Sequence, residues 1–287
     1  MSATRFAPSP TGYLHTGHAF SALTAFETAR RLGGRFVLRI EDIDFTRCQP
    51  PFEAAIYEDL AWLGLAWETP VLRQSEHIAD YLGALERLRG MGLVYRCFAT
   101  RREIAETMLS APHGAPEGYR GATAPAPAAE EAARLAAGEP FAWRLHLAAA
   151  QAVAGPLTFV EAGEGPAGER GVIDVAPSPA GDVVLARKDV GVAYHLAVVV
   201  DDARQGVTDV VRGQDLFDAT HVQRLLQALL GLPAPRYHHH RLITGADGKR
   251  LAKRDAAQTL RARRALGATP DDVRRDLGFS PLTGGQA

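Results

Sequence analysis

Apolar and polar residues follow one another along the first 95 residues in the patterns expected of short strands and amphipathic helices. Residues 5–18 begin as an extended stretch, break at prolines and a glycine, and lead into a helix predicted over residues 19–29. An apolar run predicts a strand over residues 35–40, and helical spacing predicts amphipathic helices over residues 52–63 and 77–89. This order of strands and helices indicates an α/β fold.

The pattern is interrupted in the middle of the chain and resumes near residue 189. Between residues 96 and 188, segments rich in alanine and proline alternate with Glu-Ala helical sequence and a Gly-Glu-Gly-Pro loop, which indicates an insertion. Beyond it we predict strands over residues 194–200 and 207–212, a helix over residues 221–230 capped by Thr220, and a basic helical end. The predicted parts are a first half of the main domain (1–95), an inserted subdomain (96–188), a second half (189–245) and a C-terminal helical part (246–287).

The composition is that of a globular protein of 287 residues, 46% of them hydrophobic, which can bury a sizeable core. No apolar run reaches the length of about 18 residues that a bilayer requires, and the first residues lack the apolar stretch of a secretory signal. We therefore expect a cytoplasmic protein that does not enter a membrane. Two cysteines, Cys48 and Cys97, do not indicate a disulfide framework.

The net charge of −1 conceals a basic segment near the C-terminus, where only Asp255 opposes the lysines and arginines. Such a surface could follow the phosphate backbone of a nucleic acid, and a solvated helix face is the alternative. The basic residues of this segment are Lys249, Arg250, Lys253, Arg254, Arg261, Arg263 and Arg264.

Two histidines stand at the predicted entrance of the first helix. His15 and His18 lie on nearly the same helix face because of their spacing. A helix N-terminus carries unpaired N–H groups and a partial positive charge, so both imidazoles could hydrogen-bond phosphate oxygens there. Gly17, which has no side chain, would let a flat base approach the backbone. A loop histidine pair without a ligand is the alternative.

The segment from Arg5 to His18 resembles the first signature of class I aminoacyl-tRNA synthetases, in the form used by their glutamyl branch. Residues 250–254, Arg-Leu-Ala-Lys-Arg, resemble the second signature of that class, a lysine-bearing loop. The resemblance covers most of the chain outside its middle segment, and it implies a Rossmann-like parallel sheet and ATP-dependent activation of an amino acid with release of pyrophosphate. A solvated basic turn is the alternative interpretation of the second motif.

The resemblance also assigns roles around ATP. It implies that Lys253 stabilises the transition state at the α-phosphate, because a positioned ammonium stabilises developing negative charge. Ala252 stands where relatives carry serine, which removes a hydroxyl and keeps the cation. The implied ATP-binding residues are His15, Gly17, His18 and Lys253.

An amino-acid pocket is implied in the same way. In the glutamyl family the arginines matching Arg5 and Arg212 contact substrate carboxylates, which a guanidinium fork pairs well. The acid matching Glu41 faces the substrate ammonium, at the end of a predicted strand where open parallel sheets place ligands. An exposed acid is the alternative for Glu41, and a surface pair with Asp215 is the alternative for Arg212. The family further implies Phe6, Ala7, Pro8, Ser9 and Tyr194 as pocket residues, while the role of His195 stays open.

One feature of the family is degenerate here. Relatives of the short glutamyl type often bind zinc through Cys-x-Cys, a tyrosine and a further cysteine. The matching positions in this chain are Cys97, Ala99, Tyr119 and Thr123, so two thiolates are missing. Since structural zinc needs four ligands, we expect no zinc. The histidines at 238–240 lie in an extended segment that points neighbours to opposite faces, so we expect no metal there either.

A shortened branch of the family transfers activated glutamate to the queuosine base at the anticodon wobble position of tRNA(Asp), and this chain resembles that branch. The resemblance implies that L-glutamate and ATP form glutamyl-adenylate, which a hydroxyl of the modified base then attacks. Mg²⁺ is expected on the phosphates, and queuosine-containing tRNA(Asp) is the expected partner of a monomer. The alternatives are a truncated glutamyl-tRNA synthetase that charges a tRNA 3′ end and a non-catalytic nucleotide- or tRNA-binding protein.

Overall fold

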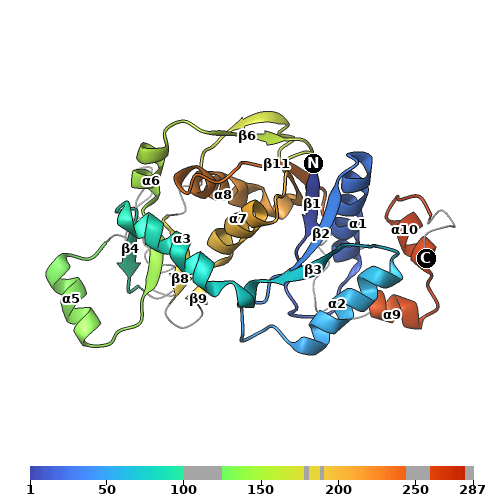
Figure 1. Cartoon of the computed structure of the whole chain (residues 1–287), viewed down its shortest axis with the longest axis horizontal. Helices are drawn as coiled ribbons and strands as arrows, with labels where there is room; N and C mark the ends of the chain where they lie inside the picture. Colours follow the sequence, from blue (N-terminus) through green and yellow to red (C-terminus); the bar gives the residue numbers. More distant parts are fainter. Residues whose placement is uncertain (100–124, 178–180, 188–190, 244–258, 282–287) are drawn as a thin grey trace.

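A seven-stranded sheet runs through the centre of the molecule (Figure 1). The computed structural model describes residues 1–99, 125–177, 181–187, 191–243 and 259–281. Neighbouring strands are parallel except at the end of the sheet, where β7 runs antiparallel to β6. The strands, in spatial order, are β3 (Glu68–Arg73), β2 (Arg35–Ile40), β1 (Ala3–Phe6), β10 (Asp209–Gly213), β11 (Arg236–His240), β6 (Thr158–Glu161) and β7 (Gly171–Asp174). The expected α/β fold with a parallel sheet is confirmed.

The register of the sheet brings several strand ends together at one edge. Phe6 pairs with Leu38 of β2, and Gly213 pairs with His240 of β11. The neighbours β1 and β10 are far apart in the sequence, so the strand order reverses between them. In open parallel sheets a crevice forms outside the carboxyl ends of the strands at such a reversal, and ligands bind in it.

The helices form two groups, each with its own hydrophobic core. One core joins α1 (Thr16–Arg31), α2 (Pro50–Trp62) and the two C-terminal helices α9 (Leu260–Ala265) and α10 (Pro270–Asp276) to β1 and β2. The other joins α3 (Ile78–Gly90), α7 (Tyr194–Arg204) and α8 (Phe217–Leu229). Figure 1 shows the two groups on opposite sides of β1 and β2. Among the described residues, no helix combines the length and the apolar character needed to span a bilayer.

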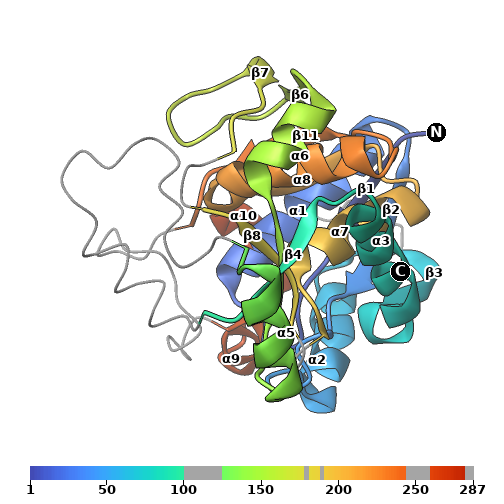
Figure 2. The same ribbon diagram turned by 90° about the vertical axis from the view of Figure 1, so that its left-hand side faces the viewer.

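A second, four-stranded sheet lies beside the α3 group and carries helix α5 (Ala128–Ala136) at its outer end (Figure 1). Its strands, antiparallel and in spatial order, are β4 (Val94–Cys97), β5 (Ala142–Leu145), β8 (Val183–Arg187) and β9 (Gly191–Val192). Helix α6 (Leu147–Ala154) follows β5 and joins the same core. The predicted insertion over residues 96–188 contributes strands to both sheets, because its hairpin β6–β7 extends the large sheet (Figure 2). The boundaries of the insertion stay a prediction.

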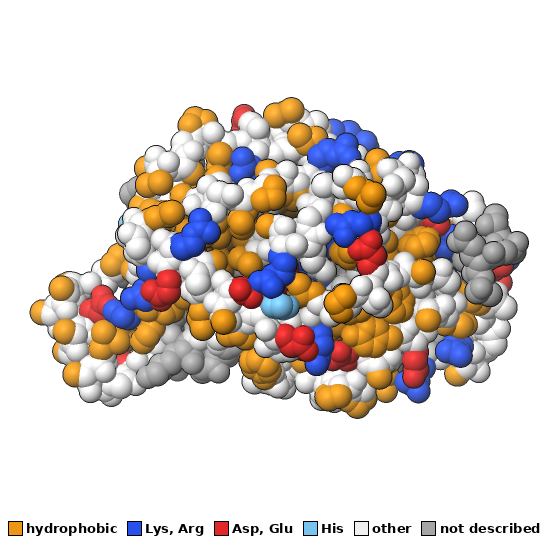
Figure 3. Space-filling model, in the orientation of Figure 1, with side chains coloured by type: hydrophobic (Ala, Val, Ile, Leu, Met, Phe, Trp, Pro, Cys, Tyr) orange, Lys and Arg blue, Asp and Glu red, His pale blue; other side chains and the backbone are white. Residues whose placement is uncertain are grey.

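Most predicted elements are present. The predicted helix over residues 19–29 lies within α1. Those over residues 52–63 and 77–89 match α2 and α3 except for one residue each, Leu63 and His77, which are caps. Residues 35–40 form β2, and residues 207–212 overlap β10. The C-terminal helical part contains α9 and α10, although residues 244–258 and 282–287 lie outside the described part. On the face in Figure 3, basic and acidic side chains lie side by side among hydrophobic ones.

The predicted strand over residues 194–200 is wrong, because this segment is helix α7. The run from Leu196 to Val199 is buried, since α7 packs between α3 and α8. A short, fully buried apolar run has no polar face, and its periodicity therefore does not distinguish a strand from a helix.

The predicted helix cap at Thr220 is also wrong. Helix α8 begins at Phe217, directly after the 3₁₀ turn Gln214–Leu216, so Thr220 lies in its first turn. Its hydroxyl instead accepts a hydrogen bond of 2.6 Å from Arg212 Nη2. The preference of threonine for helix starts therefore gave the wrong boundary here, while the side chain serves a tertiary contact.

Candidate functional site

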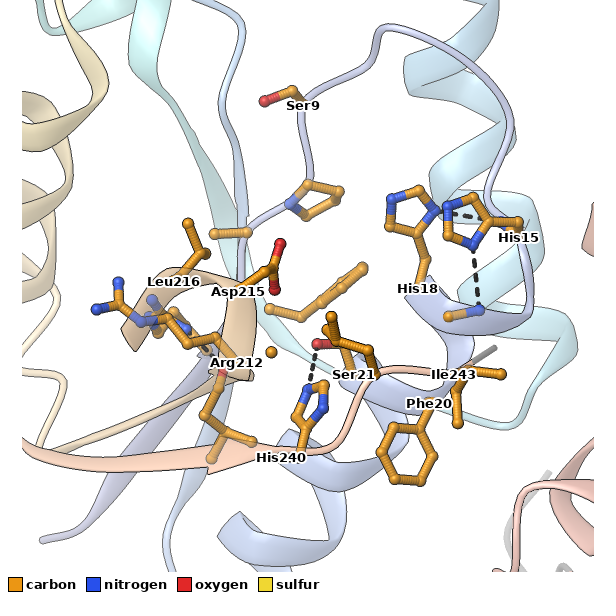
Figure 4. Close-up of a pocket in the computed structure, with 18 of the residues that line it drawn as sticks. Ser9, His15, His18, Phe20, Ser21, Arg212, Asp215, Leu216, His240 and Ile243 are labelled. Atoms are coloured by element: carbon orange, nitrogen blue, oxygen red, sulfur yellow. Dashed lines mark hydrogen bonds between the residues drawn. The ribbon is translucent and has the colours of Figure 1, made fainter. Parts of the chain in front are cut away.

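A cavity of about 490 Å³ lies at the edge where β1, β2, β10 and β11 end and α1 begins. It brings together every described residue that the sequence analysis assigned to the nucleotide and to the amino acid. Those residues are Arg5, Phe6, Ala7, Pro8, Ser9, His15, Gly17, His18, Glu41, Tyr194 and Arg212. We call this space the first cavity. In Figure 4, His15 and His18 stand on one side of it and Arg212 on the other.

The two histidines build the start of α1. His15 is its N-cap, and its Nδ1 accepts a hydrogen bond of 3.1 Å from the backbone N–H of Gly17. His18 Nδ1 accepts a hydrogen bond of 3.2 Å from the backbone N–H of His15, which completes a reciprocal capping box. The rings stack with their centroids 3.8 Å apart. Since both Nδ1 atoms accept hydrogen bonds, each neutral ring carries its proton on Nε2, which makes Nε2 a donor.

Gly17 leaves room for the imidazole that caps the helix. A Cβ at position 17 would lie 3.0 Å from His15 Cε1, closer than ordinary van der Waals contact. The glycine therefore leaves room for the capping imidazole as well as for a ligand above the backbone.

Arg5 is buried at the end of β1 with 4% of its surface exposed. Its Nε lies 3.2 Å from Asp202 Oδ1, and its Nη1 donates a hydrogen bond of 3.0 Å to the carbonyl of Val211. These two contacts leave N–H groups of the guanidinium for a ligand, because arginine has five donors. The first cavity thus has one cation held in place by a buried carboxylate.

Arg212, on β10, is the second buried cation, with 4% of its surface exposed. Its Nη1 donates to Gln223 Oε1 at 2.7 Å, its Nη2 donates to Thr220 Oγ1 at 2.6 Å, and its Nε donates to His239 Nε2 at 3.2 Å. These partners are uncharged groups, so the guanidinium is positioned by hydrogen bonds. The alternative of an Arg212 surface pair is wrong, because the side chain is buried.

Glu41 follows β2 and is 8% exposed, so the alternative of an ordinary exposed acid is wrong as well. Its Oε1 lies 3.3 Å from Arg39 Nη2. Burial raises the pKa of Glu41 above its usual value, although the charges of Arg39 and Arg5 oppose this. A ligand cation beside Glu41 would favour the ionised carboxylate, as would any opposite charge at that distance.

A second cavity of about 410 Å³ adjoins the first and shares Ser9, Glu41 and Tyr194 with it. Asp44, Arg47 and Arg187 are among its other lining residues, so it lies between the large sheet and strand β8 of the small one.

His195 also lines the second cavity. His195 Nδ1 is buried without a hydrogen-bond partner among the described residues, and burial, followed by the charge of Arg212, lowers the pKa of His195 to about 4.

The opposite end of the first cavity contains residues that the sequence analysis did not assign. His240 Nε2 lies 2.7 Å from Ser21 Oγ, and the His240 ring meets Phe20 edge to face (Figure 4). The first cavity continues along residues 241–243. The strand alternation expected for residues 238–240 is confirmed, because His239 turns to Glu161 while His240 turns to Ser21. Their proximity to α1 is set by sheet order, which no local pattern reveals.

Several predicted residues lie outside the described part of the chain. Residues 244–258 are among them, so Lys253 and the basic residues Lys249 to Arg254 are not described. Both flanks of that segment reach the entrance of α1: Ile243 lines the first cavity, and Thr259 pairs with His15 in an isolated β-bridge. Tyr119 and Thr123 are not described either, while Cys97 is buried at the end of β4, two residues before Ala99.

The described members of the basic segment lie on α9. The guanidinium of Arg261 lies over the ring of Tyr13, that of Arg264 lies over Trp62, and Arg263 pairs with Asp276. Within the described ranges no group of three or more histidine, cysteine, aspartate or glutamate side chains could hold a metal ion. The zinc expectation rests on the sequence alone.

Residues 2–277 match the family of class I tRNA synthetases (E and Q), catalytic domain. A glutamyl-Q tRNA(Asp) synthetase from Rhodobacter capsulatus is 50% identical over 96% of this chain and 99% of its own length. One from Nocardia farcinica is 44% identical over 94% of this chain and 82% of its own. Among solved structures, a glutamate-tRNA synthetase from Elizabethkingia anophelis superposes with a TM-score of 0.72 at 27% identity, over 93% of this chain. The chain spans 54% of that longer protein.

Proposed function

We infer that this chain, which belongs to the class I tRNA synthetases of the E and Q type, is a ligase. We propose that it activates L-glutamate with ATP and transfers the glutamyl group to the queuosine base at the anticodon wobble position of tRNA(Asp). The observation that carries this proposal is one cavity in which two buried guanidiniums and one buried carboxylate face the start of a helix. We further propose that the enzyme acts in the cytoplasm as a monomer.

The charges of the first cavity are complementary to glutamate. The amino acid has two carboxylates and one ammonium, and the cavity offers Arg5 and Arg212 against Glu41. Each arginine is already anchored by protein contacts, so little side-chain entropy is lost when a carboxylate binds. Glutamine would place an amide where a carboxylate belongs and leave a buried guanidinium without its counter-charge, so glutamate should be strongly preferred.

ATP fits the other half of the first cavity. The N-terminus of α1 attracts phosphate, and the Nε2–H groups of His15 and His18 can donate to phosphate oxygens. The base would lie beside Gly17 and the strip formed by Phe20, His240 and Leu242. Lys253 belongs to a segment whose two flanks meet at this entrance, which supports its role at the α-phosphate.

The reaction has two steps. An oxygen of the glutamate α-carboxylate attacks the α-phosphorus of ATP, the bond to the β-phosphate oxygen breaks, and pyrophosphate leaves with the charge that Lys253 and the histidines stabilise. A hydroxyl of the queuosine base then attacks the activated carbonyl, the bond to AMP breaks, and the hydroxyl proton is released. The second cavity, which shares Ser9, Glu41 and Tyr194 with the first, gives the acceptor a route to that carbonyl.

Magnesium would be held by phosphate oxygens and water, as Mg²⁺ usually is on nucleotides. The described residues offer no cluster of carboxylates or histidines for a resident metal, so no step is assigned to one. Neither does the mechanism use zinc.

Pyrophosphate exchange with ATP and glutamate, followed by transfer of labelled glutamate to total tRNA, tests the proposal. We expect exchange with glutamate and hardly any with glutamine. The label should remain on tRNA(Asp) when a nuclease removes the acceptor end, and it should be absent when the tRNA comes from cells that do not make queuosine.

The same experiment separates the two alternatives. A truncated glutamyl-tRNA synthetase, for which the likeness to the longer glutamate-tRNA synthetase is the supporting observation, would lose its label together with the 3′ end. A non-catalytic binding protein would support no pyrophosphate exchange at all.

A further inference from the structure

A buried chain of hydrogen bonds leads from β6 to the cavity arginine on β10. Glu161 ends β6, His239 lies on β11 and Arg212 on β10, so three adjacent strands contribute one residue each. His239 Nδ1 lies 2.5 Å from Glu161 Oε2, and Arg212 Nε donates to His239 Nε2 at 3.2 Å. The side chains of Glu161 and His239 are fully buried. Neither residue is needed for the chemistry described above.

The surroundings of Glu161 determine which ring nitrogen of His239 carries the proton. Glu161 Oε1 accepts backbone N–H groups from Gly163 and His239, at 2.8 and 2.9 Å. Oε2 is therefore the oxygen that accepts the Nδ1–H of the ring. Burial favours a neutral imidazole and lowers the pKa of His239. The hydrogen bond that the ring donates to Glu161 opposes this, and the charge of Arg212 lowers the pKa further.

The carboxylate itself is ionised. Burial alone would raise the pKa of Glu161, but the hydrogen bonds from the His239 ring, the His239 backbone and Gly163 outweigh it, so the pKa lies below its usual value. Glycine is needed at position 163, because a Cβ there would lie 2.2 Å from the His239 carbonyl oxygen. The close approach of this loop to β11 therefore belongs to the same arrangement.

The tautomer has a direct consequence for Arg212. With the proton on Nδ1, the lone pair of Nε2 can accept from Arg212 Nε, and Thr220 Oγ1 lies 3.2 Å from the same nitrogen. With the proton on Nε2, two N–H donors would face each other and the guanidinium would have to turn. Such a turn would also disturb the bonds of the same guanidinium to Gln223 and Thr220, which fix its plane.

We propose that Glu161 and His239 are positioning residues for the substrate carboxylate: Glu161 holds His239 as the Nδ1–H tautomer, and the Nε2 lone pair of His239 aims Arg212 into the first cavity. This inference deepens the proposed function and rests on it, because Arg212 is taken as a carboxylate partner of glutamate. It assigns a specificity role to a glutamate that is 78 residues away from its histidine in the sequence.

Glu161→Gln is the central test, because the amide has nearly the same shape but can donate to Nδ1. We expect the Michaelis constant for glutamate in pyrophosphate exchange to rise by about tenfold or more, while that for ATP changes by less than about twofold. Discrimination against glutamine should fall as well. The matched control is Glu164→Gln on the same loop, whose half-exposed side chain pairs with Arg170 and should leave all three quantities unchanged.

Histidine nitrogen NMR gives a readout that needs no substrate. In the parent protein we expect the His239 ring to show a protonated Nδ1 and an unprotonated Nε2, and in Glu161→Gln the reverse. The His239 signal is identified by its absence from His239→Gln. An Nε2–H tautomer in the parent protein would overturn the inference, and so would an unchanged glutamate constant in Glu161→Gln.

Two substitutions at 239 cover the case in which Glu161→Gln fails to fold. His239→Gln offers an amide oxygen as an acceptor for Arg212, whereas His239→Leu offers none, so only the leucine variant should raise the glutamate constant by about tenfold. Equal glutamate constants in the two variants would contradict the inference.

If the parent protein shows no exchange with glutamate, the proposed function fails, while the tautomer measurement still decides the arrangement of Glu161 and His239.

Discussion

Arg5 Nε lies 3.2 Å from Asp202 Oδ1, so a carboxylate near the end of α7 balances one of the two arginines of the first cavity. The same oxygen lies 2.9 Å from Arg39 Nη1. Burial alone would raise the pKa of Asp202, but the charges of Arg5 and Arg39 outweigh it and hold that pKa below its usual value. Strands β1 and β2 and helix α7 are therefore joined by one buried charged cluster next to the site.

Asp202→Asn should destabilise the protein because it leaves two buried guanidiniums without their shared carboxylate. Removing one partner of a buried ion pair costs about 3–5 kcal/mol. Urea unfolding should show this loss at neutral pH. Glu68→Gln serves as the control, because the Arg35–Glu68 pair is partly exposed and should contribute less than about 1 kcal/mol. Equal effects of the two substitutions would contradict the role given to Asp202.

The sequence predicts those parts of the fold in which local pattern and tertiary environment agree. Helix α1 and strand β2 carry a recognisable periodicity, and the motif from Arg5 to His18 runs through the strand end and helix start that it builds. Helix α7 carries no such periodicity, because its buried run Leu196 to Val199 is equally compatible with a strand.

The supporting residues of the site were not predictable for another reason. Asp202 reaches Arg5 across 197 positions and Glu161 reaches His239 across 78, so their contacts exist only once the sheet order is known. Each of these acids looks locally like an ordinary polar residue at the end of an apolar run. Resemblance to a family supplied residues that line the first cavity, and it left out those that hold them in place.

His195 should make the stability of the protein depend on mildly acidic pH. Its folded-state pKa of about 4 lies below the unfolded value of about 6.5, so between these values the unfolded chain binds a proton that the folded protein does not. The contribution to stability is complete above about pH 6.5 and is lost as the pH falls towards about 4.

His195→Gln removes the imidazole that binds this proton in the unfolded chain. On going from about pH 8 to about pH 5, the unfolding free energy of the parent protein should fall by about 1–2 kcal/mol more than that of the variant. Urea unfolding at the two pH values measures the difference, with ligands left out. Parallel losses in the parent and the variant would show that His195 is already protonated in the folded protein, or that it is exposed.

Lys253→Ala should remove a charge that acts mainly in the transition state of activation. Losing such an interaction costs about 2–4 kcal/mol, which corresponds to about two to three decades in the rate of pyrophosphate exchange. The affinity for glutamate should change little, because the proposed function assigns Lys253 to the α-phosphate of ATP and not to the amino acid. Exchange that stays within about threefold of the parent would contradict the assignment.

Purified protein should contain far less than one equivalent of zinc. Cys97 and the tyrosine at position 119 are too few for a tetrahedral site when alanine and threonine occupy the other two matching positions. Elemental analysis before and after treatment with a chelator measures the content. Zinc at one equivalent that resists the chelator would contradict the prediction.

The two roles of His15, as helix cap and as phosphate donor, can be separated by two substitutions. His15 Nδ1 accepts the Gly17 N–H in the capping box of α1, so the donor of the neutral ring is Nε2–H, which the proposed function assigns to phosphate. Asparagine is among the best N-cap residues, and its side-chain oxygen lies about where Nδ1 lies, but it has no donor at the position of Nε2.

His15→Asn should therefore keep the stability of the parent within about 0.5 kcal/mol, whereas His15→Ala should lose about 1 kcal/mol. Both should lose about two decades in pyrophosphate exchange, because each lacks the donor that meets the developing charge. If His15→Asn kept most of the activity, the imidazole would act only as a cap, and the charge stabilisation assigned to it would belong to His18 and the helix N-terminus.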